Sequence, residues 1–194
     1  MSTAILLLAA GASSRMGQPK MFLTYQGSSL LQHAVQAATA TSPHCFVVAG
    51  ALAWEIAIEL RDDPVRVIHH TGWEAGIGSS IAVGVTSILN TKLQPSNILI
   101  TVCDQPFIDH ALLQQLIDQQ AHTSKGIIAC AYEDTIGTPV LFDQQYFPAL
   151  QALSGQQGAK KILQEHPDAV ATVDFPRGAF DIDTPEDYAR LQNL

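Results

Sequence analysis

Basic side chains are scarce in this sequence. Lysine and arginine number 10 against 18 aspartates and glutamates, so the formal net charge at pH 7 is −8. Proteins that bind nucleic acid or an anionic membrane surface usually present clustered positive charge. We therefore expect neither a nucleic acid nor a membrane as a partner. A phosphate-bearing small molecule, which needs only a few local cations, stays compatible with this composition.

Cysteines and long apolar runs are also few. Cys45, Cys103 and Cys130 have no paired spacing and lie in apolar stretches, so we expect packed free thiols in a reducing compartment. The N-terminal run Ala4–Ala10 is too short to span a bilayer, and no basic residue precedes it. Together these absences predict a cytoplasmic protein.

Apolar residues, by contrast, are plentiful. They make up 47% of the 194 residues, whereas charged residues make up 14%. Such a chain can bury a large core, which excludes global disorder, and its length suits one domain of ordinary size. No repeat, linker or change in composition marks a boundary, so we expect a single domain over residues 1–194.

Apolar runs of strand length alternate with helical patterns along the chain. The strands that we expect are Ala4–Ala10, Cys45–Ala49, Arg66–His69, Ile98–Cys103, Ile127–Tyr132, Pro139–Phe142, Ala169–Val173 and Ala179–Asp183. The helices that we expect are Ser29–Thr39, Trp54–Leu60, Ser80–Leu89, His110–Gln120, Gln144–Leu153, Ala159–His166 and Pro185–Leu191. Ile5–Leu8 and Ile98–Val102 are apolar at nearly every position, which is typical of strands with helices on both faces. The pattern predicts an α/β fold, a three-layer α/β/α sandwich around a mostly parallel, Rossmann-like sheet.

The loop after the first expected strand is rich in small residues. It reads Ala9-Ala-Gly-Ala-Ser-Ser-Arg-Met-Gly-Gln-Pro-Lys20, and its glycine spacing fits neither the phosphate loop of nucleotide hydrolases nor the dinucleotide-binding fingerprint. Small residues still let backbone N–H groups approach an anion, and Arg15 and Lys20 supply charge for a triphosphate. On spacing alone, an ordinary Gly/Ser-rich turn with two solvated cations explains the loop equally well.

The same loop resembles the signature of nucleotidyltransferases that build activated sugars and cofactors. It is most similar to that of the MobA-like molybdenum cofactor cytidylyltransferases. Further motifs follow in that family's order: Trp73-Glu-Ala-Gly-Ile-Gly-Ser-Ser-Ile81, Cys103-Asp-Gln-Pro106, Gly137-Thr-Pro-Val-Leu-Phe142 and Asp181-Ile-Asp-Thr-Pro-Glu-Asp187. The resemblance therefore covers essentially the whole chain.

Two positions depart from the family pattern. Ile77 stands where the family usually has Met, which is a conservative change. Gln156, in the segment Ser154–Lys160, stands where the family commonly has an acidic residue. The second departure leaves the role of that segment open, although it does not affect the nucleotide chemistry.

The resemblance implies a reaction and its participants. CTP donates its CMP moiety to the phosphate of molybdenum-molybdopterin, and molybdopterin cytosine dinucleotide and pyrophosphate are formed. Mg²⁺ is the implied cofactor, with Mn²⁺ as the alternative, and a client molybdoenzyme is the implied recipient of the product. The alternatives are a guanylyltransferase for the same cofactor, a transferase for another phosphorylated small molecule, and a non-catalytic chaperone that binds the cofactor.

The resemblance also assigns roles to single residues. It implies that Arg15, Lys20 and Asp104 are catalytic and that Asp104 and Asp183 bind the metal. The residues that it implies for nucleotide binding are Ala9, Ala10, Gly11, Ala12, Ser13, Ser14, Arg15, Lys20, Gly78, Ser79, Ser80 and Asp104.

Each acidic candidate has a structural alternative. Asp104 follows an apolar strand, where a carboxylate faces the ligand crevice; its alternative role is to cap the following turn, for which Asp109, just ahead of the helix from His110, is the better candidate. On a strand Ala179–Asp183, the side chains of Asp181 and Asp183 point to opposite faces, so only one of them can reach the site. The resemblance favours Asp183. Thr184 reads as the cap of the last helix.

Other candidates have equally plain alternatives. Ser79 and Ser80 can cap the helix that follows them instead of binding the nucleotide. Trp73 can pack on the domain rather than wall a pocket. Trp54 is expected in the core.

Overall fold

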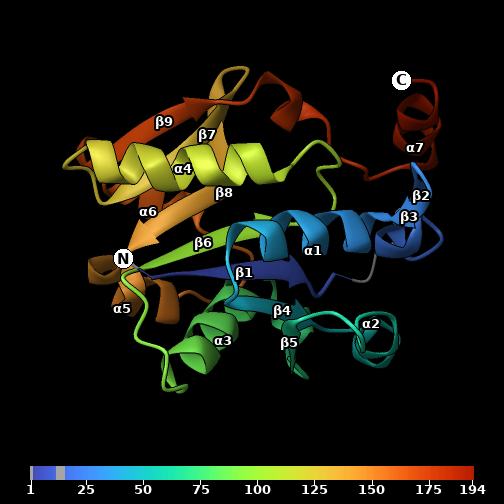
Figure 1. Ribbon diagram of the computed structural model, residues 1–194, viewed down its shortest axis with the longest axis horizontal. Helices are drawn as coiled ribbons and strands as arrows, with labels where there is room; N and C mark the ends of the chain where they lie inside the picture. The colour runs from blue at the N-terminus through green and yellow to red at the C-terminus, as the bar shows by residue number, and fades with distance from the viewer. Residues whose placement is uncertain (1, 12–15) are drawn as a thin grey trace.

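The computed structural model describes residues 2–11 and 16–194. At its centre lies a seven-stranded sheet with the order β5-β4-β1-β6-β8-β7-β9 (Figure 1). Its strands are β1 (Thr3–Ala9), β4 (Cys45–Ala49), β5 (Val65–His69), β6 (Asn97–Val102), β7 (Ile127–Tyr132), β8 (Thr135–Asp143) and β9 (Val170–Asp174). A separate hairpin consists of β2 (Thr24–Tyr25) and β3 (Ser28–Ser29).

The large sheet is mostly parallel. β1 pairs in parallel with β4 on one side and with β6 on the other, and β4 pairs in parallel with β5. β8 runs antiparallel to both β6 and β7, whereas β9 is parallel to β7. The carboxyl ends of β1, β4, β5 and β6 therefore meet at one edge, which is where open α/β sheets bind ligands.

Helices cover both faces of the sheet. They are α1 (Leu30–Thr41), α2 (Ala53–Glu59), α3 (Ile77–Leu89), α4 (His110–His122), α5 (Phe147–Gln151), α6 (Lys160–Glu165) and α7 (Pro185–Gln192). Figure 1 shows α1 and α4 on one side of the sheet and α3 and α5 on the other. Within the described chain, no helix has both the length and the apolar character that a membrane crossing demands.

The side chains of β1 explain this layering. Leu6 and Leu8 belong to an apolar cluster with residues of α3, α5 and α6, whereas Ile5 and Leu7 belong to clusters with residues of α1, α2 and α4. Alternate residues of a strand point to opposite faces, so a strand with apolar residues at every position needs cover on both sides. The three-layer α/β/α sandwich that the sequence predicts is thus confirmed.

Side-chain caps determine where three of the helices begin. The backbone N–H of Gln32 donates to Ser29 Oγ at the start of α1, at 3.0 Å. The N–H of Leu112 donates to Asp109 Oδ1 at the start of α4, at 2.8 Å, so Asp109 is the cap, as expected. Thr184 begins α7 in a reciprocal capping box with Asp187, which confirms the second expected cap.

The prediction of a strand over Ala179–Asp183 is wrong. Pro176–Ala179 forms a turn of 3₁₀ helix, and the residues after it join no described strand. One backbone bond, from Ile182 N to Asp104 O at 2.9 Å, ties this segment to the end of β6. Its alternation of apolar and polar residues arises because Phe180 stacks near Phe107 and Ile182 is buried against residues of α1 and α7.

The expectation that Trp54 lies in the core is also wrong. In α2, Ile56 is fully buried, whereas Trp54 is 77% exposed and Ile58 is 51% exposed. Residues 54 and 58 are four apart and share a helix face, while residue 56 lies on the opposite face. Only one of the two faces can pack on the sheet.

The three cysteines are free and buried, as the sequence predicts. Burial raises the pKa of each thiol to about 12, and at Cys103 the neighbouring Asp104 adds to this effect. Because the thiolate is the reactive form, we expect the native chain to resist iodoacetamide at about pH 8. The chain unfolded in denaturant should take up a label at each cysteine, as counted by mass spectrometry. Rapid labelling of the native chain would contradict this prediction.

Candidate functional site

A cavity of about 610 Å³ opens at the carboxyl ends of β1 and β6. The expected site residues that line it are Ala9, Ala10, Gly11, Lys20, Ser80, Asp104 and Asp183. The other lining residues are Leu8, Met21, Trp73, Glu74, Gly76, Ile77, Val102, Cys103 and Gln156. Motifs that are far apart in the sequence therefore meet around one space.

Small residues form the wall of this cavity that follows β1. Ala9 ends β1, Ala10 and Gly11 follow it, and a Cβ atom placed on Gly11 would meet nothing within 4 Å. Gly11 is exposed, so its backbone is accessible to a ligand. The remaining expected residues of the loop, Ala12, Ser13, Ser14 and Arg15, lie outside the described residues.

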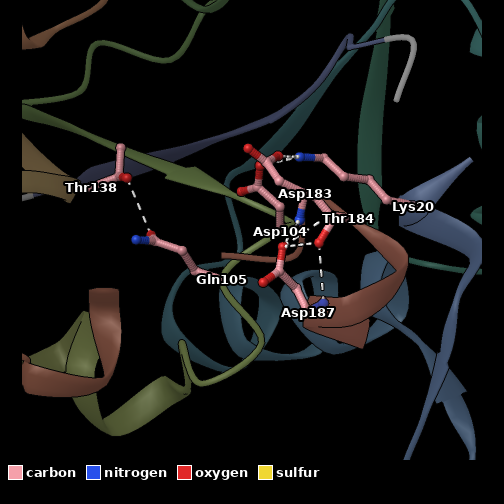
Figure 2. A network of polar contacts seen from close by, with 7 residues as sticks. All are labelled: Lys20, Asp104, Gln105, Thr138, Asp183, Thr184 and Asp187. Carbon is pink, nitrogen blue, oxygen red and sulfur yellow. Dashed lines mark hydrogen bonds and ion pairs between the residues drawn. The ribbon is translucent and has the colours of Figure 1, made fainter. Parts of the chain in front are cut away.

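Three charged side chains converge at the cavity. Figure 2 shows the Lys20 side chain reaching from one side toward the carboxylates of Asp104 and Asp183. Its Nζ lies 2.7 Å from Asp104 Oδ2 and 2.8 Å from Asp183 Oδ1. The sequence predicts each of these residues for the site but does not predict that, in the free protein, the lysine bonds both acids.

The electrostatic balance of this cluster favours the charged forms. Burial by itself works to lower the pKa of Lys20, but Asp104 and then Asp183 outweigh it and raise the pKa above the ordinary value. Only 16% of the Lys20 side chain is exposed, so solvent screens the attraction little. Lys20 therefore stays cationic across the physiological range.

The two carboxylates reach the cluster from different ends of the chain. Asp104 follows β6, and Asp183 precedes the N-cap residue of α7. The bond from Ile182 N to Asp104 O holds the two segments side by side. Because Thr184 and Asp187 satisfy the start of α7 between themselves, the carboxylate of Asp183 does not cap this helix and instead accepts a bond from Lys20 at the cavity.

Gln105, next to Asp104, ties together the segments that carry the two carboxylates. Its side chain is buried, and Nε2 donates to the carbonyl of Gly178 at 2.7 Å. Thr138 Oγ1 donates to Gln105 Oε1 at 3.2 Å, as drawn in Figure 2. The amide thus connects the end of β6 to β8 and to the segment that leads to Asp183.

Asp181 lies nearer to this cluster than strand alternation implies. Burial, followed by the negative charges of Asp104 and Asp183, raises the pKa of Asp181 to about 6. The strand on which the expected opposition of Asp181 and Asp183 depended is absent. Asp183 nevertheless lines the cavity and Asp181 does not.

The motif Trp73–Ile81, which contains Gly76 and Gly78, brings a second part of the chain to the cavity. Gly76 adopts φ +111°, and a Cβ atom there would lie 2.4 Å from the carbonyl oxygen of Gly155. Gly78 does not line the cavity; its N–H donates to Gly155 O at 2.9 Å. The glycines therefore let the segment around Gly155 dock on the start of α3, which places Gln156 at the cavity. Both segments are recognisable in the sequence, but the sequence does not predict that they touch.

Ser79 and Ser80 lie in different surroundings. Gly76 is the N-cap residue of α3, so neither serine caps this helix. Ser80 is buried and lines the cavity. Ser79 Oγ donates to Gly76 O and lies 2.9 Å from His70 Nε2, away from the cavity lining. Trp73 both walls the cavity and packs against the core.

The acidic pair fits a divalent cation that also binds phosphate. Asp104 and Asp183 already direct one oxygen each at a single positive charge, and carboxylate oxygens suit Mg²⁺ and Mn²⁺. Among the described residues, no three acidic, histidine or cysteine side chains are grouped to hold a metal by themselves. Mg²⁺ commonly binds through one or two carboxylates plus substrate phosphates, which matches a pair of this kind.

Known proteins share both the sequence pattern and the fold. Residues 5–170 match the MobA-like NTP transferase domain. Nicotine blue oxidoreductase of Paenarthrobacter nicotinovorans is 30% identical over 96% of this chain and 94% of its own length. A probable molybdenum cofactor guanylyltransferase of Bacillus cereus is 25% identical over 96% of this chain and 94% of its own.

A solved structure superposes along the entire chain. Rv0371c from Mycobacterium tuberculosis matches with a TM-score of 0.82 at 27% identity, covering 100% of this chain and 98% of that one. A structure of Rv0371c in complex with manganese matches with a TM-score of 0.80 at 25% identity, covering 100% and 99%. Since the domain match spans most of the sequence and the structural match all of it, this chain belongs to the MobA-like NTP transferase family of nucleotidyltransferases.

Proposed function

We propose that this protein transfers the CMP moiety of CTP to the phosphate of molybdenum-molybdopterin and releases pyrophosphate. The observation that carries the proposal is the cluster of Lys20, Asp104 and Asp183 at a cavity whose other wall is the small-residue loop after β1. In this proposal, residues 1–194 act as one domain, and a client molybdoenzyme receives the dinucleotide product.

The proposed chemistry needs charge placement rather than a nucleophilic side chain. The acceptor phosphate is itself an anion, so its oxygen attacks the α-phosphorus of CTP while the bond to pyrophosphate breaks. The barrier comes from bringing two polyanions together, and fixed positive charge lowers it. Lys20 supplies such a charge, and Arg15 is proposed to do the same, together with backbone N–H groups of Ala10–Ser14.

Asp104 and Asp183 are the residues proposed to hold a divalent metal. When bound, Mg²⁺ or Mn²⁺ neutralises phosphate oxygens and orients them. The manganese bound in the related Rv0371c structure supports a divalent metal of this kind in the family. Asp104 and Asp183 keep their two oxygens close together because the backbone bond between Ile182 and Asp104 joins their segments.

Ala10 is proposed to favour a pyrimidine base. It lines the cavity at the end of β1, and in this proposal its methyl group narrows the space for the base so that the smaller pyrimidine fits better than a purine. Ala10→Gly should raise the ratio of kcat/KM for GTP to that for CTP by about tenfold, since one methyl group in a pocket commonly changes specificity by that order. Steady-state rates with both nucleotides measure the ratio. An unchanged ratio in the folded variant would refute this role.

Thermal unfolding with Mg²⁺ and each nucleoside triphosphate in turn is the first test. A ligand at a hundred times its dissociation constant stabilises the folded state by about 2.7 kcal/mol, which is an easily measured shift. Stabilisation by CTP, followed by pyrophosphate release with molybdopterin, supports the proposal. A response to GTP alone points to guanylyl transfer, and CTP binding without pyrophosphate release points to a cofactor chaperone.

The same series includes NADH and NADPH. These cofactors are added because the relative in Paenarthrobacter nicotinovorans is named as an oxidoreductase. Stabilisation by a nicotinamide cofactor, together with no response to any nucleoside triphosphate, would overturn the proposed transfer reaction.

A further inference from the structure

The ammonium of Lys20 occupies the place between the two acids that are proposed to bind the metal. Its Nζ lies 2.7 Å from Asp104 Oδ2 and 2.8 Å from Asp183 Oδ1 (Figure 2). These distances are those of charge-assisted hydrogen bonds, so Lys20 uses one oxygen of each carboxylate. A positive charge that belongs to the chain therefore already lies where the metal is expected.

Two cations compete for these oxygens. A divalent ion bound by both carboxylates would lie a few ångströms from the ammonium if Lys20 stayed in place, and like charges at such a distance repel strongly at a site shielded from solvent. Solvent screens this site only in part, because 16% of the Lys20 side chain is exposed, against 27% for Asp104 and 35% for Asp183. A metal that takes the two oxygens now bonded to Lys20 requires the lysine to leave at least one carboxylate.

Phosphate groups offer the lysine another partner. The cavity beside Lys20 is also lined by Ala10 and the exposed Gly11, which follow β1 and where a triphosphate is proposed to bind. Phosphate oxygens accept bonds from an ammonium as readily as carboxylates do. They also complete the coordination of a metal that the protein holds through only two carboxylates.

We infer that Lys20 is an internal cation that blocks the Asp104–Asp183 pair in the free protein, so that a divalent metal enters only with the nucleotide. The inference rests on the proposed function for the identity of the two metal ligands. It adds an order of binding and assigns Lys20 a second role besides contacting phosphate. It also makes a counterintuitive prediction, namely that removing this lysine improves metal binding.

The test measures the affinity of the full-length chain for Mn²⁺ alone, from the free-Mn²⁺ signal in electron paramagnetic resonance. Without nucleotide, we expect Lys20→Ala to bind Mn²⁺ at least about tenfold more tightly than the wild type, because the competing charge is gone. Lys20→Arg keeps the charge and should stay near the wild-type affinity. Lys160→Ala removes an equally charged, exposed side chain that does not line the cavity, and it should also show no gain.

Further measurements test whether the gain in Mn²⁺ affinity depends on Asp183 and whether Mn²⁺ binds the folded state. The double variant Lys20→Ala/Asp183→Asn should lose the gain. Mn²⁺ alone should raise the melting temperature of Lys20→Ala but not that of the wild type, since only the variant binds it in the folded state. Lys20→Gln serves as a second uncharged variant if Lys20→Ala does not fold, and the same gain is expected for it.

Two results would overturn the inference. They are wild-type Mn²⁺ affinity in both folded, uncharged Lys20 variants, and a gain in Mn²⁺ affinity that persists after Asp183→Asn. Failure of the proposed function is seen separately, because the metal titration contains no nucleotide. If the wild type releases no pyrophosphate while Lys20→Ala still gains Mn²⁺ affinity, the proposed reaction is wrong, but the inference that Lys20 blocks the acidic pair stands.

Discussion

Asp104→Asn is expected to lower kcat/KM for pyrophosphate release by at least about a hundredfold while the chain stays folded. Asparagine keeps the size of the side chain but removes the charge that faces Lys20 and the proposed metal. Asp104 caps no helix, since Asp109 begins α4, and its backbone carbonyl still accepts the bond from Ile182. The fold should therefore tolerate the change, and circular dichroism and thermal melting check this.

A matched control separates a local effect from a general change in charge. Asp118→Asn removes one carboxylate from the exposed surface of α4, and its rate should equal that of the wild type. Normal turnover by folded Asp104→Asn would reject the catalytic and metal roles proposed for Asp104. A loss of activity shared by both variants would point to the overall charge instead.

Lys20→Ala should lower kcat by at least about a hundredfold, because it removes a cation from the site where negative charge develops on the leaving pyrophosphate. Lys20→Arg should recover part of this activity, since it restores the charge without the compact geometry of an ammonium. Single-turnover measurement at saturating CTP separates the chemical step from binding.

The control for this variant is Lys160→Ala. In the wild type, the ammonium of Lys160 donates to Thr135 Oγ1 in an exposed position. Its turnover should be that of the wild type. If folded Lys20→Ala also turned over normally, the triphosphate contact proposed for Lys20 would be wrong. Lys20→Ala is also expected to bind Mn²⁺ more tightly than the wild type. Poor metal binding could therefore not explain a loss of rate in this variant.

Much of the fold could be predicted from local pattern. β1 and β6 were predictable because strands covered on both faces need apolar side chains at nearly every position. The segment 180–183 was not, because Phe180 and Ile182 alternate with acids for a different reason, their packing beside α7. Alternation shows which side chains are buried but does not show whether a neighbouring strand is present to pair.

The site was predictable in its members but not in its contacts. Lys20, Asp104 and Asp183 each belong to a motif at the end of an expected element, and the structure brings them to one cavity. Their pairing depends on side-chain positions that no single motif determines. Gln156 was missed as a cavity residue because its place depends on the docking of Gly155 against the start of α3, a contact between segments about 80 residues apart.

The bond from Lys20 to Asp183 joins residues that are 163 positions apart. A ribosome that has just completed the strands β1, β4 and β5 has made the lysine but neither of its acids, and Asp104 follows well before Asp183 does. The growing chain can thus acquire most of its central sheet while its reaction centre is still missing a component. Synthesis therefore completes the cluster of Lys20, Asp104 and Asp183 only after the residues that precede α7 have been made.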